Sequence, residues 1–183
     1  MTTTTETGHG TTSHDGAVTH GTPATPNATP TRDPGQQGPR LDLVAPWRDG
    51  YRAMSAFDRA VCRSDLEESL LNLVKLRASQ INGCAYCLDM HAKDARAAGE
   101  SPQRLDVLAA WREVPLYSER ERAALALAES ITLVADTHVP DEVVAAAQAQ
   151  FTPEELVQLV FHVVTINAWN RISITARSPL PPA

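Results

Sequence analysis

Two cysteines and a histidine share one short segment of the chain and could carry out thiol chemistry. Cys84 and Cys87 form a Cys-x-x-Cys pair, and His91 follows four residues later. Residues three and four apart lie on one face of a helix, so a helix here would bring both thiols and the imidazole together. Thiols at this spacing can close a disulfide, and a neighbouring base favours the thiolate. The segment therefore predicts a dithiol redox site.

The helix that must hold these residues is predicted from about Cys84 to Ala98. Gly83 precedes it and is well placed to end an earlier helix, because glycine accepts the left-handed conformation common just past a helix C-terminus. Gly99 ends the new helix in the same way. Both cysteines then fall in the first turn, where free N–H groups and the helix dipole stabilise a thiolate. Helix position alone slightly favours Cys84 as the more reactive thiol.

Helices are also predicted for the rest of the folded chain, so the fold class is all-α. Ala, Leu, Glu and Arg dominate, and no stretch alternates apolar and polar residues for long enough to form a sheet. An opening helix is predicted from about Trp47 to Cys62, and Ser64 with Glu67 matches a capping box for the next helix. The last helix, which starts after Thr152, is apolar nearly all round. This predicts burial against a second subunit.

The chain divides into a tail and one helical domain. Residues 1–40 are rich in Thr, Pro, Gly and His and contain almost no large apolar side chain. Such a segment cannot bury enough surface to offset the entropy that ordering costs. We expect a disordered tail over residues 1–40, a helical domain over residues 41–179 and a short C-terminal tail over residues 180–183.

Composition and charge disfavour several classes of function. The formal net charge is −6, and basic residues alternate with acidic ones, which disfavours nucleic-acid binding. No apolar stretch has the length of a membrane span, and the N-terminus lacks the pattern of a signal peptide. Two of the three cysteines sit in one pair, a usage that suits a reducing compartment. We expect a cytoplasmic protein with neither a nucleic-acid nor a membrane partner.

Longer motifs carry a resemblance to a known family. The run over residues 76–87 reads Leu-Arg-Ala-Ser-Gln-Ile-Asn-Gly-Cys-Ala-Tyr-Cys, and Asp-Met-His follows at residues 89–91. Over residues 66–177 the chain resembles the alkylhydroperoxidase D-like branch of the carboxymuconolactone decarboxylase family. Later segments that also match are 111–113, 121–125 and 166–171. The resemblance implies an all-helical subunit that assembles into a homotrimer or homohexamer.

The resemblance also implies a function and roles for particular residues. Proteins of this branch reduce hydroperoxides in antioxidant defence, at the expense of a thiol or dithiol reductant protein. By that pattern Cys87 attacks the peroxide, Cys84 resolves the sulfenic acid into a disulfide, and His91 removes the proton from the attacking thiol. The family's relay also uses a glutamate where this chain has Asn72, an amide that cannot accept the proton. Glu68, one turn earlier on the same helical face, is our candidate for its replacement.

Other readings of the same residues stay open. The pair and the histidine could be three ligands of a zinc site, with Cys62 or His162 as the fourth, but the spacing is cramped for one tetrahedral ion on one helix. We therefore predict no metal and no cofactor. Otherwise His162, among apolar neighbours, is a hydrogen-bonded core histidine. Asn167, Asn170 and Arg171 either line the site or satisfy buried polar groups.

Two alternative functions accompany the peroxidase. A decarboxylase acting on a lactone acid is suggested by the family name, but that chemistry is not expected to need a cysteine pair. A non-enzymatic redox sensor or oligomeric scaffold is favoured by the loss of the relay glutamate at Asn72. Sustained turnover with a reductant separates the peroxidase from the sensor, which would be oxidised only once.

Overall fold

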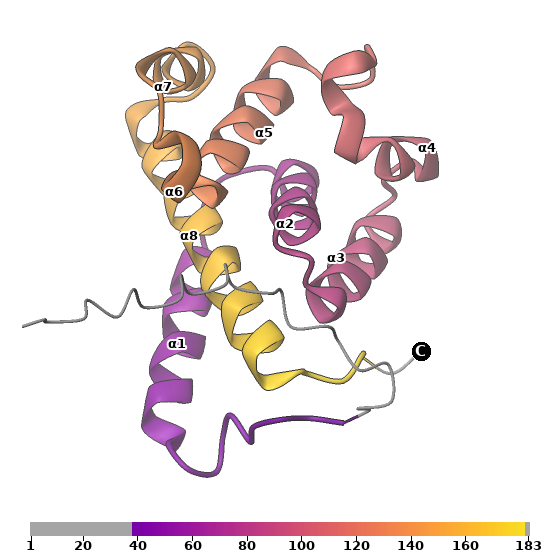
Figure 1. Ribbon diagram of the computed structural model, residues 1–183. Coiled ribbons are helices and arrows are strands. Elements are labelled where there is room, and N and C mark those ends of the chain that lie inside the picture. The colour runs from indigo at the N-terminus through magenta and orange to yellow at the C-terminus, as the bar shows by residue number, and fades with distance from the viewer. Residues whose placement is uncertain (1–37, 182–183) are drawn as a thin grey trace, which may run out of the picture. The chain divides into compact units, whose positions relative to one another are not determined.

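The computed structural model describes residues 38–181, and all of their regular secondary structure is helical (Figure 1). The predicted all-α fold class is confirmed for this part of the chain. Most of the tail predicted over residues 1–40, and residues 182 and 183, lie outside the described residues. In chain order the elements are α1 (Arg48–Val61), α2 (Glu68–Asn82), α3 (Ala85–Ala97), α4 (Pro102–Asp106), the 3-10 helix η1 (Leu108–Glu113), α5 (Glu119–Thr132), α6 (Val134–Thr137), α7 (Asp141–Gln148) and α8 (Pro153–Ala176).

Helix α2 lies at the centre of the domain and packs against α3, α5 and α8 (Figure 1). Its apolar side chains serve two buried clusters. Leu71 and Val74 join one cluster with α5, α7 and α8, and Leu73 and Leu76 join another with α3, α4, η1 and α5. Full burial of one such side chain contributes about 2 kcal/mol. The segment that precedes the cysteines is therefore held in place from several sides.

The turn between α2 and α3 positions the cysteine pair. Gly83 has φ 68° and ψ 35°, the left-handed conformation that ends α2. Cys84 follows as the N-cap of α3, and its sulfur accepts the N–H of Cys87 at 3.4 Å. Helix α3 then runs to Ala97, with Gly99 in a left-handed conformation just beyond it. The predicted helix, and the position of both cysteines at its start, are confirmed.

One predicted helix start is right and another is wrong. Thr152 and Glu155 form a capping box ahead of α8, in which each side chain accepts the backbone N–H of the other residue. The capping box expected at Ser64 is not formed, because α2 starts later and has Glu67 as its N-cap. The Ser64 hydroxyl is instead hydrogen-bonded to Nε2 of His162 at 2.8 Å. Ser64, which the local sequence pattern predicts as a helix cap, is therefore bonded to a distant residue, His162, instead.

Helix α8 buries one side and leaves another apolar side exposed. Phe161 packs against Phe57 of α1 with ring centroids 6.0 Å apart, yet both rings remain more than a third exposed. Val157 and Val164 extend this exposed strip, which we call the α1/α8 apolar strip. An exposed apolar strip of this kind is typical of an interaction surface. That a second subunit covers it stays a prediction.

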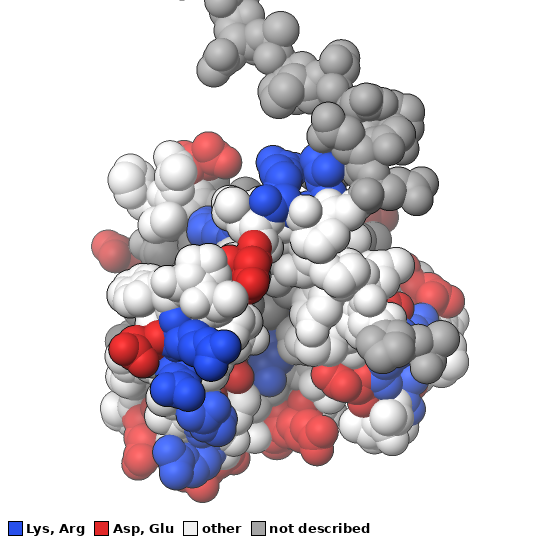
Figure 2. All heavy atoms as spheres, turned by 90° about the horizontal axis from the view of Figure 1, so that it is seen from below, with Lys and Arg blue, Asp and Glu red and all other residues white. Residues whose placement is uncertain are grey.

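The described surface carries both signs of charge. On the face shown in Figure 2, Lys and Arg side chains occur together with Asp and Glu side chains. Arg120, for example, forms ion pairs with Glu67 at 3.0 Å and with Glu155 at 2.7 Å. Over residues 38–181, the structure contains no helix with the length and apolar character needed to span a bilayer.

Candidate active site

The two cysteines of the motif meet at the start of α3. Their sulfurs lie 2.9 Å apart, both residues are about 1% exposed, and both are free thiols. They pack against Ala78 of α2 and Ile166 of α8, so helices distant in sequence enclose the pair. A short rotation of either side chain would bring the sulfurs to bonding distance. The geometry therefore suits a redox-active dithiol.

The two thiols hold their protons very differently. The pKa of Cys84 falls to about 6, first because the Cys87 thiol donates a hydrogen bond to its sulfur and then because the Cys87 N–H does so, against the opposing effect of burial. The pKa of Cys87 is raised because its proton is held by Cys84, by burial, and by the nearby negative charge. The pair therefore shares one proton near neutral pH and carries one negative charge. This direction agrees with the preference for Cys84 that helix position gives.

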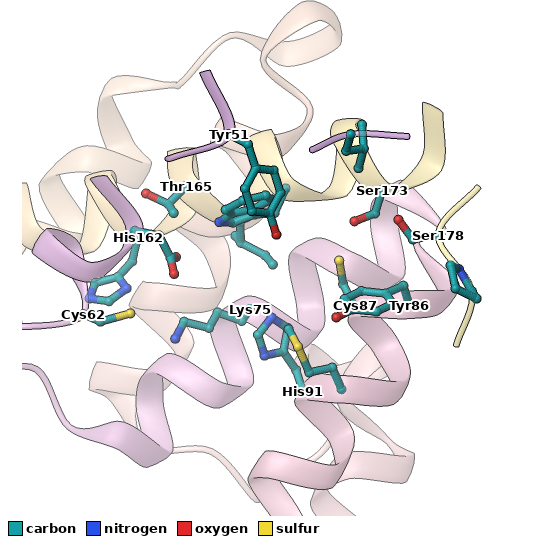
Figure 3. Close-up of a pocket in the computed structure, with 16 residues that line it drawn as sticks. Tyr51, Cys62, Lys75, Tyr86, Cys87, His91, His162, Thr165, Ser173 and Ser178 are labelled. Carbon is teal, nitrogen blue, oxygen red and sulfur yellow. The ribbon is translucent and has the colours of Figure 1, made fainter. Parts of the chain in front are cut away.

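A cavity of about 380 Å³ opens beside the pair, at the junction of α1, α2, α3 and α8 (Figure 3). Cys87 lines it, whereas Cys84 is not among the lining residues. Tyr51 and Trp169 make an edge-to-face pair in its wall, with ring centroids 5.7 Å apart. Further lining residues are Leu43, Asp58, Cys62, Lys75, Tyr86, Met90, His91, His162, Thr165, Ile166, Ser173, Ser178 and Pro179. The walls are mostly apolar and aromatic, as in small-molecule sites.

His91 lines the same cavity and lies between Lys75 and Cys87 in the view of Figure 3. His91 is 7% exposed, and its Nδ1 atom is buried without a hydrogen-bond partner. Burial, followed by the positive charge of Lys75, lowers the pKa of His91 to about 4, and Asp94 acts in the opposite direction. His91 is therefore neutral at pH 7 and can accept a proton.

Helix α8 places polar side chains near the sulfurs. Asn170 is fully buried; its Oδ1 accepts from Asn82 at 2.8 Å and its Nδ2 donates to Ser79 at 3.1 Å. As a nearby donor, the same side chain also lowers the pKa of both thiols and so favours the thiolate form of each. Ser173, one turn further along α8, acts on Cys87 in the same direction. Of the two roles that the sequence left open for Asn170, the structure shows the satisfaction of buried polar groups, whereas Asn170 is not among the residues that line the cavity.

The residues proposed for the relay lie in a second cavity of about 760 Å³. Asn72 is 6% exposed, and its Nδ2 has no hydrogen-bond partner. Glu68 is exposed and lines this second cavity, but it does not line the cavity that holds Cys87. Lys75 lines both cavities. The structure therefore separates Glu68 from the thiols more than the helical-face argument suggested.

The remaining candidates have plainer surroundings. His162 is 1% exposed and hydrogen-bonded to Ser64, which confirms the hydrogen-bonded core histidine, although it also reaches both cavities. Burial and the charge of Lys75 lower the pKa of His162 to about 4. Cys62 is an exposed free thiol. Among residues 38–181 no cluster of His, Cys, Asp and Glu side chains is arranged to hold a metal ion.

Fold and site together define an all-helical protein with a buried Cys-x-x-Cys pair, a neutral histidine and an apolar cavity. The model of the carboxymuconolactone decarboxylase family matches residues 48–130. The uncharacterised protein YdfG of Bacillus subtilis (strain 168) is 43% identical over 131 residues, which cover 72% of this chain and 88% of that protein. The chain belongs to the carboxymuconolactone decarboxylase family.

Solved structures confirm the expected AhpD-like fold. A protein of unknown function from Agrobacterium tumefaciens, described as a proposed antioxidant defence protein AhpD, superposes with a TM-score of 0.77 at 38% identity. That match covers 80% of this chain and all of the other. An uncharacterised peroxidase-related protein with an AhpD core from Ralstonia eutropha JMP134 has a TM-score of 0.64 at 21% identity, over 73% of this chain and 71% of its own. The second likeness concerns the fold alone.

Proposed function

We propose that this protein is a thiol-dependent hydroperoxidase, a dithiol-disulfide oxidoreductase that serves antioxidant defence. One observation carries the proposal: Cys87 lines an apolar cavity while its sulfur lies 2.9 Å from that of Cys84. A substrate in the cavity can reach one thiol, and the other thiol is already close enough to complete a disulfide. The similarity to a proposed antioxidant defence protein from Agrobacterium tumefaciens supports the same reaction class.

The reaction starts from the pair with one shared proton. The Cys87 sulfur, once its proton has passed to Cys84 or His91, attacks the hydroperoxide; an S–O bond forms, the O–O bond breaks, and the leaving alkoxide takes a proton to become an alcohol. The Cys84 sulfur then attacks the sulfenic acid, forming the disulfide and releasing water. The two thiols supply both electrons. A thiol or dithiol reductant protein restores them by exchange.

The cavity favours an organic hydroperoxide over hydrogen peroxide. Its volume of about 380 Å³ lies within the usual range of small-molecule sites. Hydrogen peroxide has roughly the size of two waters, or about 60 Å³, and would leave most of that space unfilled. The Tyr51 and Trp169 rings, with Met90 and Ile166, offer an apolar surface for an alkyl or aromatic group. We expect the larger substrate to gain binding energy from these contacts.

The proposal is tested by peroxide consumption. Purified, reduced protein is mixed with cumene hydroperoxide and dithiothreitol, and wild type is compared with Cys87→Ser and Cys84→Ser. Sustained turnover that is lost in Cys87→Ser supports the peroxidase, and a sulfenic acid that accumulates in Cys84→Ser but not in Cys87→Ser when the reductant is left out assigns the attack to Cys87. Oxidation that occurs once and does not recycle would reject the peroxidase in favour of the redox sensor.

Cellular and quaternary context form part of the same proposal. Because the thiols must be regenerated, we place the protein in the reducing cytoplasm. We also propose a homotrimer or homohexamer, in which the α1/α8 apolar strip meets another copy of the chain. The exposed rings of Phe57 and Phe161 support this assignment. Light scattering on the purified protein measures the assembly, and a monomer would reject it.

A further inference from the structure

We propose that Asp94 is a positioning residue that holds His91 in its working tautomer and connects it to solvent. The inference rests on the proposed hydroperoxidase, for which it supplies the route of the proton. It answers a specific deficiency: His91 Nδ1 is buried without a hydrogen-bond partner, and the amide of Asn72 cannot accept a proton. A carboxylate beside Nδ1 would fix the proton on that atom and leave Nε2 as the acceptor.

The geometry favours Asp94 for this position. His91 Nδ1 and Asp94 Oδ2 are 3.6 Å apart, which is an ion-pair distance and slightly longer than a hydrogen bond. The two side chains differ sharply in exposure, with 9% for His91 and 55% for Asp94. His91 lines the cavity that holds Cys87, whereas Asp94 lines the second cavity. The pair therefore joins the buried thiol site to solvent across the boundary between the two cavities.

Two other charged groups act on His91 and must be weighed against Asp94. Lys75 of α2 opposes protonation of the imidazole, and its effect is larger than that of Asp94. Asp58 of α1 favours protonation, but less strongly than Asp94 does. Glu68, also in the second cavity, is not among the groups that act on His91. Asp94 is therefore the carboxylate with the strongest hold on this histidine.

The proton balance shows why such a connection is needed. A pair with one negative charge, one hydroperoxide and one proton give the disulfide, an alcohol and water. Reduction of the disulfide by a dithiol then returns the charged pair and releases one proton. Each cycle therefore takes one proton from solvent and gives one back, although both thiols are about 1% exposed. With Nδ1–H directed at Asp94, Nε2 of His91 is left to accept the proton from the thiol side.

The first test does not depend on activity. Nitrogen-15 shifts of histidine-labelled protein at pH 7 report the tautomer of His91, whose signal is assigned by its loss in His91→Gln. We expect the Nδ1–H tautomer in wild type and in Asp94→Glu, and a shift toward the Nε2–H tautomer in Asp94→Asn. Glu68→Gln is the matched control and should leave the tautomer unchanged. An unchanged tautomer in Asp94→Asn overturns the inference.

The second test uses turnover of cumene hydroperoxide. A well-placed proton acceptor contributes on the order of 100-fold or more, and loss of its positioning partner should remove a share of this, about fivefold in kcat. We expect Asp94→Asn to lose about fivefold with little change in KM, and Asp94→Glu to recover most of the loss. Equal rates in wild type and Asp94→Asn would overturn the inference alone. Absence of turnover in wild type would reject the proposed function, while the tautomer would still test Asp94.

Discussion

The two sides of the dithiol site differ in how completely their polar groups are paired. On the α8 side, Asn170 bonds to Asn82 and Ser79 and lowers the pKa of both thiols, and all of these residues are buried or half-buried. On the opposite side, Asn72 Nδ2 of α2 and His91 Nδ1 of α3 are buried without hydrogen-bond partners, and Asp94 lies 3.6 Å from the latter. A fully paired buried network holds its side chains rigidly. An unpaired buried group lowers the stability of the fold, so it is more often found where function requires it. The sulfurs are thus held firmly while the proton route is left open.

The largest effect is expected on the paired side, where Asn170→Ala removes the shared partner. Asn82 and Ser79 would lose their bonds to Asn170, while Asn82 keeps its bond to Asn167, and we expect a loss of about 3 kcal/mol in the free energy of unfolding. The pKa of Cys84 should also rise, because a donor to its sulfur is lost. Urea unfolding measures the first effect, and thiolate absorbance at 240 nm against pH measures the second.

Asn167→Ala is the matched control for Asn170→Ala. Asn167 is on the same helix, donates to Thr132 of α5 and to the Val163 carbonyl, and accepts from Asn82 as Asn170 does, but it is not among the groups that act on either sulfur. It should lose comparable stability and leave the thiolate titration in place. Cys62 is a third, exposed thiol, so this titration is made in a Cys62→Ser background. Absorbance there should correspond to one thiolate per subunit above about pH 6, because the pKa of Cys84 is lowered to about 6 and that of Cys87 is raised. Two thiolates at pH 8 would contradict the shared proton.

Much of this contrast lies beyond what the sequence could predict. The spacing of Cys84, Cys87 and His91 placed the motif on one helix face, and Gly83 located the turn before it, because both rest on local backbone geometry. The donors from α8 come from residues more than eighty positions away, and local periodicity cannot say which face of α8 meets the thiols. Asp94 was equally hidden, because a charged residue on a helix is usually a solvated one.

A smaller effect is expected on the incomplete side, where Asn72→Glu supplies a carboxylate. The new charge would lie one turn from Lys75 and in the cavity that also contains Asp94. We expect the pKa of His91 to rise, since negative charge favours the imidazolium, and hydroperoxide turnover to increase about tenfold. Asn72→Gln has the length of glutamate without the charge and should stay at the wild-type rate. Equal rates for the two variants would show that proton transfer is not limiting.

The smallest effect concerns Ser64, which the sequence pattern predicts as a helix cap but which the structure shows bonded to His162. If Ser64 stabilised α2 as a helix cap, Ser64→Ala would lower the free energy of unfolding by about 1 kcal/mol, whether or not residue 162 is a histidine. If Ser64 acts instead as the hydrogen-bond partner of buried His162, Ser64→Ala would lower the free energy of unfolding by a similar amount only while His162 is present. Urea unfolding of Ser64→Ala, His162→Gln and the double variant separates the two. We expect a coupling of about 1 kcal/mol, because the hydrogen bond can be lost only once. Strictly additive losses would mean that Ser64 stabilises the start of α2 independently of α8, and that the bond at 2.8 Å contributes nothing of its own.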